Sequence, residues 1–168
     1  MRGAEGAARG AGGCMKRPKL AVTTMDRPIA ELVRKTDHKI LVVWAADCAE
    51  RVLPHFEEKY PEDTRPRRAI EACREWARTG VFRMADVRRT ALAAHAAARE
   101  IKEGDPAHSA ARAAGQAMAT AHVPTHAIAA AIYAATAVRD ASNPDNADSA
   151  TTREREWQYQ HLLGLTEK

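Results

Sequence analysis

The sequence has no long apolar run. No stretch approaches the roughly 18 uninterrupted apolar residues that a membrane-spanning helix requires. The N-terminus also lacks the apolar middle region of a secretory signal. These absences argue against a membrane protein and against a secreted one. We therefore expect a cytoplasmic protein that has no membrane partner.

Cysteine is scarce, and the common catalytic and metal-binding motifs are missing. The three cysteines, Cys14, Cys48 and Cys73, are odd in number and include no C-x-x-C pair. This excludes a disulfide framework and a cysteine-rich zinc site. No nucleophile elbow, phosphate-binding glycine loop, paired-carboxylate motif or EF-hand pattern occurs. The sequence therefore predicts no cofactor, and it favours a protein that is not an enzyme.

The excess of basic charge is confined to the N-terminus. The chain has 26 Lys and Arg against 22 Asp and Glu. Residues 1–25 hold five basic side chains and one acidic side chain, so residues 26–168 hold 21 of each. A neutral domain lacks the basic surface that is typical of nucleic-acid binding. We therefore expect no nucleic-acid partner.

Residues 1–25 are predicted to be a disordered basic tail. The first 14 residues are rich in Gly, Ala and Arg and show no apolar periodicity, so they cannot bury enough surface to offset their ordering entropy. Met15 and Met25 are alternative start positions, in which case the tail is an artefact of start-site choice. We expect residues 26–168 to fold as a single helical domain without it.

Apolar periodicity predicts an all-α domain, a compact array of six or seven helices. At 168 residues and 45% hydrophobic content, the chain can bury a substantial core. Alanine fills 22 of the 60 positions from 81 to 140, so helices there are expected to pack closely, with Gly115 at a close crossing. The expected helices cover 26–36, 37–53, 63–80, 84–104, 107–122, 125–141 and 153–163, with two further turns from Pro54 and a loop at 142–150.

Local signals define several of these boundaries. Asp105 followed by Pro106 predicts the start of a helix, and Gly80 predicts the end of one. Thr151 and Glu154 have the spacing of a capping box, which would open the last helix.

The stretch "AHVPTHAIAAAIYAAT" (121–136) contains the most suggestive histidines. In one continuous helix, His122, His126 and Tyr133 would share a stripe. Pro124 lies between the histidines and would kink or divide that helix. The histidines could be metal ligands, a functional polar line or hydrogen-bonded structural residues. Because no third ligand is evident, we expect no bound metal.

Asp47 is the most informative carboxylate. It follows Ile40 and Val43 on a helix that is apolar on all sides up to Trp44, so we expect its side chain to face the interior and to need a polar partner. Arg67, Arg68, His95 and Arg99 are plausible partners. We hypothesise an internal polar cluster that fixes the helix packing, built from Asp47 and at least one of His95, Arg99, His122, His126 and Tyr133.

Five blocks of sequence occur in a characteristic order. They are "WAADCAERVLPHFE" (44–57), "RPRRAIEACREWARTG" (65–80), "ALAAHAAARE" (91–100), "ATAHVPTHAIAAAIYA" (119–134) and "EREWQYQHL" (154–162). As a set, over roughly residues 37–163, they resemble the putative immunity protein family of bacterial polymorphic-toxin systems. The positions that match are Trp44, Asp47, Cys48, Arg67, Glu71, Trp76, His95, His122, His126 and Trp157.

This resemblance implies an all-α cytoplasmic protein that binds and neutralises a cognate toxin. It supplies no catalytic residues and leaves the oligomeric state open. The residues alone also permit a second interpretation, a helical protein whose internal polar pocket binds a small ligand or metal and has catalytic activity. An adjacent toxin gene would favour the first interpretation, and a retained ligand or metal would favour the second.

Overall fold

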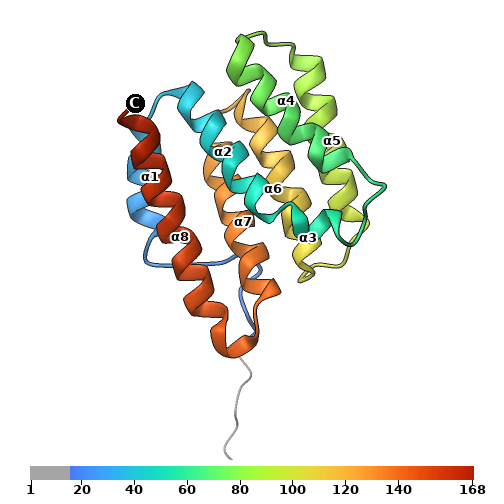
Figure 1. The fold of residues 1–168 in the computed structure, drawn as a ribbon, viewed down its shortest axis with the longest axis vertical. Helices are drawn as coiled ribbons and strands as arrows, with labels where there is room; N and C mark the ends of the chain where they lie inside the picture. Colours follow the sequence, from blue (N-terminus) through green and yellow to red (C-terminus); the bar gives the residue numbers. More distant parts are fainter. Residues whose placement is uncertain (1–15) are drawn as a thin grey trace, which may run out of the picture.

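The computed structural model describes residues 16–168, and the regular secondary structure of this part of the chain is all helix, without a strand. The expected all-α class is therefore confirmed. Residues 16–168 form eight helices, of which α3 is a single turn that begins at Pro54 (Figure 1). They are α1 (Asp26–Arg34), α2 (His38–Val52), α3 (Pro54–Glu57), α4 (Arg65–Thr79), α5 (Met84–Arg99), α6 (Pro106–Thr120), α7 (His126–Ala141) and α8 (Pro144–Thr166).

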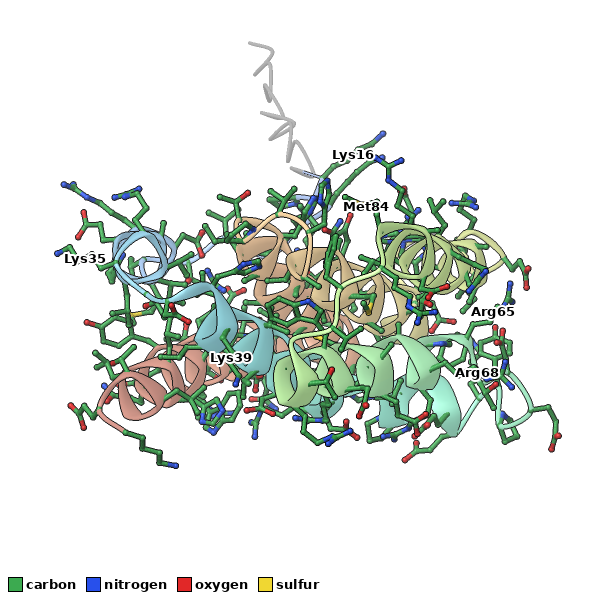
Figure 2. The ribbon with its side chains drawn as sticks, turned by 90° about the horizontal axis from the view of Figure 1, so that it is seen from above. Lys16, Lys35, Lys39, Arg65, Arg68 and Met84 are labelled. Atoms are coloured by element: carbon green, nitrogen blue, oxygen red, sulfur yellow. The ribbon has the colours of Figure 1, made fainter. Side chains whose placement is uncertain are left out.

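The six long helices form two layers. One layer contains α8, α2 and α4, and the other contains α7, α6 and α5 (Figures 1 and 2). The inner helices α2 and α6 contact each other across the interface, and α1 and α3 pack at the edges. None of the helices in the described part of the chain is both long and apolar enough to cross a membrane.

Small side chains fill the space between the layers. The buried residues of α6 are mostly alanines, and those of α7 are alanines apart from Thr136 and Arg139, so the two layers can approach closely. The larger side chain of Trp44 is fully buried, and its Nε1 donates a hydrogen bond to the Gln158 carbonyl oxygen at 2.8 Å. This bond fixes α8 against α2.

The two cysteines of the described region lie inside this core. Cys73 on α4 contacts two carbonyl oxygens through its Sγ, that of Val42 on α2 at 3.5 Å and that of Ala117 on α6 at 3.3 Å. Cys48 on α2 is also fully buried. Burial raises the pKa of both thiols, that of Cys73 to about 12.

Several helix ends lie where the sequence predicts them. The Asp105 side chain accepts a hydrogen bond from the Ala107 backbone N–H at 2.9 Å, and Pro106 is the first residue of α6. Gly80 ends α4 with φ +68°, a left-handed conformation that favours glycine. Pro124 separates two helices, because α6 ends at Thr120 and α7 begins at His126.

Two other boundaries differ from the predictions. The expected loop at 142–150 is wrong, because α8 begins at Pro144 after an extended Asn143. An Asn–Pro pair is as typical of a helix start as of a turn. The capping box is also wrong, since Thr151 lies inside α8 and its hydroxyl donates to the Ala147 carbonyl.

The helix predicted for 84–104 ends earlier than expected. The structure ends α5 at Arg99, and Ile101 is then buried outside the helix. Gly104, which was expected to end the helix, instead lies in the following turn with φ +89°. The apolar periodicity through Ile101 therefore marks burial of the chain and not the length of the helix.

Residues 18–21, which precede α1, lie against α7. Arg139 donates hydrogen bonds to the carbonyl oxygens of Pro18 and Lys19, at 2.8 and 3.1 Å, and the Ala21 N–H donates to Thr136 Oγ1 at 3.0 Å. The prediction of a disordered tail concerns residues 1–25, of which residues 1–15 lie outside the described part.

Candidate functional site

The polar residues singled out in the sequence lie on opposite faces of the molecule. Asp47 lies on the outer face of the α8–α2–α4 layer, among side chains that we name the α2 network. Most of the others lie on the α5–α6–α7 layer, among side chains that we name the α6 cluster. The α2 network consists of Asp47, Glu50, Glu57, Arg67, Arg74 and His161, and the α6 cluster of His95, Arg99, Arg112, Gln116 and His126.

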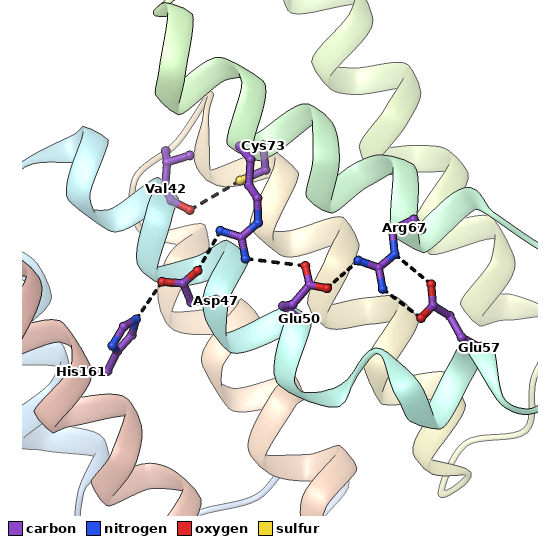
Figure 3. A network of polar contacts seen from close by, with 8 residues as sticks. Val42, Asp47, Glu50, Glu57, Arg67, Cys73 and His161 are labelled. Atoms are coloured by element: carbon purple, nitrogen blue, oxygen red, sulfur yellow. Dashed lines mark hydrogen bonds and ion pairs between the residues drawn. The ribbon is translucent and has the colours of Figure 1, made fainter.

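Asp47 joins three helices in the α2 network. Its Oδ1 accepts a hydrogen bond from Arg74 Nη1 on α4 at 2.8 Å, and its Oδ2 lies 2.7 Å from His161 Nε2 on α8 (Figure 3). Arg74 Nη2 also lies 3.5 Å from Glu50 Oε2, one turn further along α2. One carboxylate of α2 therefore links both neighbouring helices of its layer.

Arg67 extends the network to α3. Its Nη1 donates to Glu50, while Nε and Nη2 donate to the two carboxylate oxygens of Glu57 at 2.8 and 2.9 Å (Figure 3). This two-point geometry is the strong form of an Arg–carboxylate pair. The hydrogen bonds from Arg67 lower the pKa of the Glu57 carboxyl. In this network each arginine lies between two carboxylates.

An aromatic group adjoins the network on α8. The rings of Trp157 and His161 stack with centroids 4.7 Å apart, and the guanidinium of Arg51 lies 3.8 Å from the Trp157 ring centroid. Arg51 in turn donates from Nε and Nη2 to the buried carboxylate of Glu154. These contacts attach α8 to α2 along the edge of the network.

Asp47 pairs with Arg74 and His161, and not, as the sequence predicted, with a residue of the set His95, Arg99, His122, His126 and Tyr133. Ile40, Val43, Asp47 and Glu50 share one stripe of α2, and all four are only half-buried. The stripe therefore faces outward between α4 and α8, and the alanine-filled interface separates it from the other layer. The apolar residues before Asp47 mimic an interior stripe because Ile40 and Val43 are partly buried and pack against the core.

Sequence reasoning missed both partners of Asp47. Arg74 lies two turns after Arg67 on α4, so the two arginines share a helix face. This spacing was the one available signal, and in the structure both arginines contact Glu50 of α2. His161 is 114 residues from Asp47, and no local pattern connects them.

The α6 cluster centres on His95 of α5. Arg112 Nη1 lies 3.2 Å from His95 Nδ1, and because a guanidinium only donates, Nδ1 must be the accepting nitrogen. The imidazole ring lies over Gly115, where an added Cβ would be 2.7–2.9 Å from three ring atoms. Gly115 was expected at a close helix crossing, and the structure shows that it makes room for this ring.

Burial and nearby positive charges keep the His95 ring neutral. Burial is the main cause that lowers its pKa, and the charges of Arg112, Arg99 and His126 add to the effect, which brings the value to about 4. Next to it, His126 Nδ1 lies 2.7 Å from Gln116 Oε1. Within residues 16–168, no carboxylate forms an ion pair with Arg99 or Arg112.

His122 and Tyr133 lie outside the α6 cluster. His122 is exposed in the turn between α6 and α7, and its ring stacks with Phe82 at a centroid distance of 6.3 Å. Tyr133 packs on the core and lines a cavity of about 630 Å³ with His108 and Leu20. The stripe that one continuous helix would have formed is therefore divided at Pro124.

The described residues offer no evident metal centre. Nowhere in residues 16–168 are three His, Cys, Asp or Glu side chains grouped so that they could hold a metal ion. The α6 cluster presents guanidinium, amide and imidazole groups, which are suited to binding a carboxylate or another anion.

Comparison with known proteins identifies the family. The chain has no match among curated proteins or among solved structures. The family model described as Imm-5 like putative immunity protein matches residues 31–165, which run from the second half of α1 to the last turn of α8 and include both polar faces. This match covers well over half of the chain, and the protein therefore belongs to the Imm-5 like putative immunity protein family.

Proposed function

We propose that this protein protects its host cell by binding a cognate toxin and blocking it stoichiometrically. The observation that carries the proposal is the family match over residues 31–165, which indicates an immunity function. Neutralisation by binding needs a complementary surface and no chemical step by the immunity protein. The proposal adds two things to the family match: the partner is a toxin, and the mechanism is occlusion of a surface of that toxin.

The fold supports a binding function of this kind. Capped helices, an interior filled with small side chains and the α2 network hold both outer faces in defined positions. A preformed surface loses little conformational entropy when a partner binds. Several positions that carry the resemblance to the family lie on these faces and are at least partly exposed, among them Arg67, Glu71 and His95.

Co-expression with a toxin tests the proposal directly. A candidate toxin domain would be chosen from the genes next to this one and induced in a bacterial host with and without the full chain, and survival would be counted. We expect survival only when both are present, and a 1:1 complex in size-exclusion chromatography with light scattering. A catalytically inactive toxin domain serves as the control for toxicity.

The same protein preparations also test the alternative interpretation, in which the protein binds a small ligand or a metal. If the folded protein neither protects cells nor forms a complex with that toxin domain, the proposal is wrong. Native mass spectrometry and elemental analysis of protein purified without a histidine tag would then show whether it retains a small ligand or about one equivalent of metal.

A further inference from the structure

Arg112 is electrostatically unusual in this protein. Five arginines of the described region are not exposed: Arg65, Arg67, Arg112, Arg139 and Arg155. Four of them form ion pairs with carboxylates, and Arg112 does not. Its one hydrogen bond within residues 16–168 goes to the ring of His95. Among residues 16–168, Arg112 is therefore a half-buried cation without a paired carboxylate.

The contact with His95 orients Arg112 but does not neutralise it. A guanidinium has five N–H donors, and the neutral imidazole accepts from one of them. Partial burial of an unpaired charge is unfavourable. A bound anion would supply the ion pair that Arg112 does not form with the described residues of the domain. The planar guanidinium matches a carboxylate in two-point geometry.

The surroundings of Arg112 fit a protein partner. Arg99 lies one turn beyond His95 on the same stripe of α5 and supplies a second, exposed cation. Leu92, three residues before His95, is 59% exposed, and the half-buried Ala96 and Ala119 add little bulk. Protein interfaces commonly combine an arginine with a neighbouring apolar contact.

We propose that the α6 cluster is the toxin-binding site and that it takes an acidic segment of the toxin, with one carboxylate on Arg112 and a second on Arg99. This inference rests on the proposed function and adds the surface and the chemistry of the partner. A nucleic-acid phosphate backbone is a poorer match, because residues 26–168 carry equal numbers of basic and acidic side chains.

The first test compares arginines of different environment. The dissociation constant of the complex with the toxin domain would be measured by calorimetry for Arg112→Ala, for Arg99→Ala/Arg112→Ala and for Arg68→Ala. Arg68 is the matched control, since it is an exposed arginine of α4 on the other layer (Figure 2). We expect the double variant to bind at least about tenfold more weakly and Arg68→Ala to bind like the wild type.

Folding is controlled in the same series. Each variant must retain the helical circular dichroism and the melting temperature of the wild type within a few degrees. Arg112→Glu should abolish binding, and a Glu→Lys or Asp→Lys change in the contacting toxin segment should restore it. If both arginine variants bind the toxin domain as the wild type does, the inference is wrong and the proposed function stands.

A second test needs no toxin. Hexaglutamate and a six-nucleotide thymidine oligomer would be titrated into the full chain, with the Arg Nε–Hε resonances followed by NMR. We expect hexaglutamate to shift the Arg112 and Arg99 signals and the oligonucleotide to shift them less. A larger response to the oligonucleotide would overturn the proposal in favour of nucleic acid, and no response to either would overturn the anion site altogether.

Discussion

The two outer faces of the molecule use arginine in opposite ways. In the α2 network, Arg67 and Arg74 each lie between carboxylates on neighbouring helices. In the α6 cluster, Arg112 and Arg99 lie near a neutral histidine, and within residues 16–168 no carboxylate forms an ion pair with either of them. The first arrangement satisfies its own charges. In the second arrangement, the positive charges are available to pair with an anionic group of a binding partner.

This difference suggests a division of roles, in which the α2 network stabilises the fold and the α6 cluster binds a partner. A network that connects α2, α3, α4 and α8 restrains the positions of those helices, and losing one member leaves the others unpaired. A cluster without internal counter-charges contributes little to folding, so changing it should affect binding more than stability. The predictions below test this separation, from the largest expected effect to the smallest.

Asp47→Ala should lower the free energy of unfolding by about 2 kcal/mol. It removes the carboxylate that Arg74 and His161 share, and these groups are half-exposed, so the cost lies between those of surface and buried pairs. Urea unfolding at pH 7 measures the change. Glu75→Ala is the control, because its pair with Arg78 is solvent-exposed and should contribute little to stability. Equal effects of the two substitutions would show that the α2 network is not structural.

His95 should make the protein less stable in mild acid. The unfolded chain protonates this ring near pH 6.5 and the folded chain only near pH 4, so the unfolded state binds more protons in between. The contribution is fully present above pH 6.5 and is lost as the pH falls towards 4. After solvent screening at a half-buried ring, we expect about 1–2 kcal/mol.

Comparison with His95→Gln isolates this effect. Unfolding free energies of both proteins would be measured at pH 7.5 and 4.5, and the wild type should lose more stability between the two. An NMR titration that places the pKa of the His95 ring at or above 6.5 would contradict the description of the α6 cluster.

Gly115→Ala and Gly164→Ala should change stability in opposite directions. A Cβ at position 115 would lie within 2.9 Å of the His95 ring, whereas one at 164 meets nothing within 4 Å. The first substitution should destabilise by about 1 kcal/mol, as overpacking exceeds the gain in helix propensity. The second should stabilise by about 0.5–1 kcal/mol. Thermal melts distinguish the signs, and adding His95→Ala should rescue Gly115→Ala.

Arg112→Ala should have the smallest effect on folding. The substitution breaks no ion pair within residues 16–168, so we expect the free energy of unfolding to change by no more than about 0.5 kcal/mol. Arg67→Ala provides the contrast, because it leaves the carboxylates of Glu50 and Glu57 without their partner and should cost about 1–2 kcal/mol. A larger loss for Arg112→Ala than for Arg67→Ala in urea unfolding would reverse the assignment of the two faces.

The helices were predictable where local chemistry determines them. Capping at Asp105 and the left-handed Gly80 depend on neighbouring residues alone, so the sequence predicts them correctly. Asn143 and Pro144 fit a turn or a helix start equally well, and only the burial of Ala147 in the fold favours the helix.

The polar contacts were harder to predict, because they join distant residues. Asp47 lies 27 residues from Arg74 and 114 from His161. The histidines of the α6 cluster were identified as candidates, but their neighbours Arg112 and Gln116 were not. Those two residues lie one turn apart on an alanine-rich helix, and a long polar side chain among alanines was the available signal.

The buried cysteines give this molecule built-in reporters of its motions. A thiol must be exposed and deprotonated to react with an alkylating reagent, and Cys48 and Cys73 are neither in the folded state. Cys73 lies where α4 meets both α2 and α6, so its labelling rate measures how often α4 separates from the core. Cys48 reports in the same way on the opening of α2, and toxin binding would slow whichever opening it restrains.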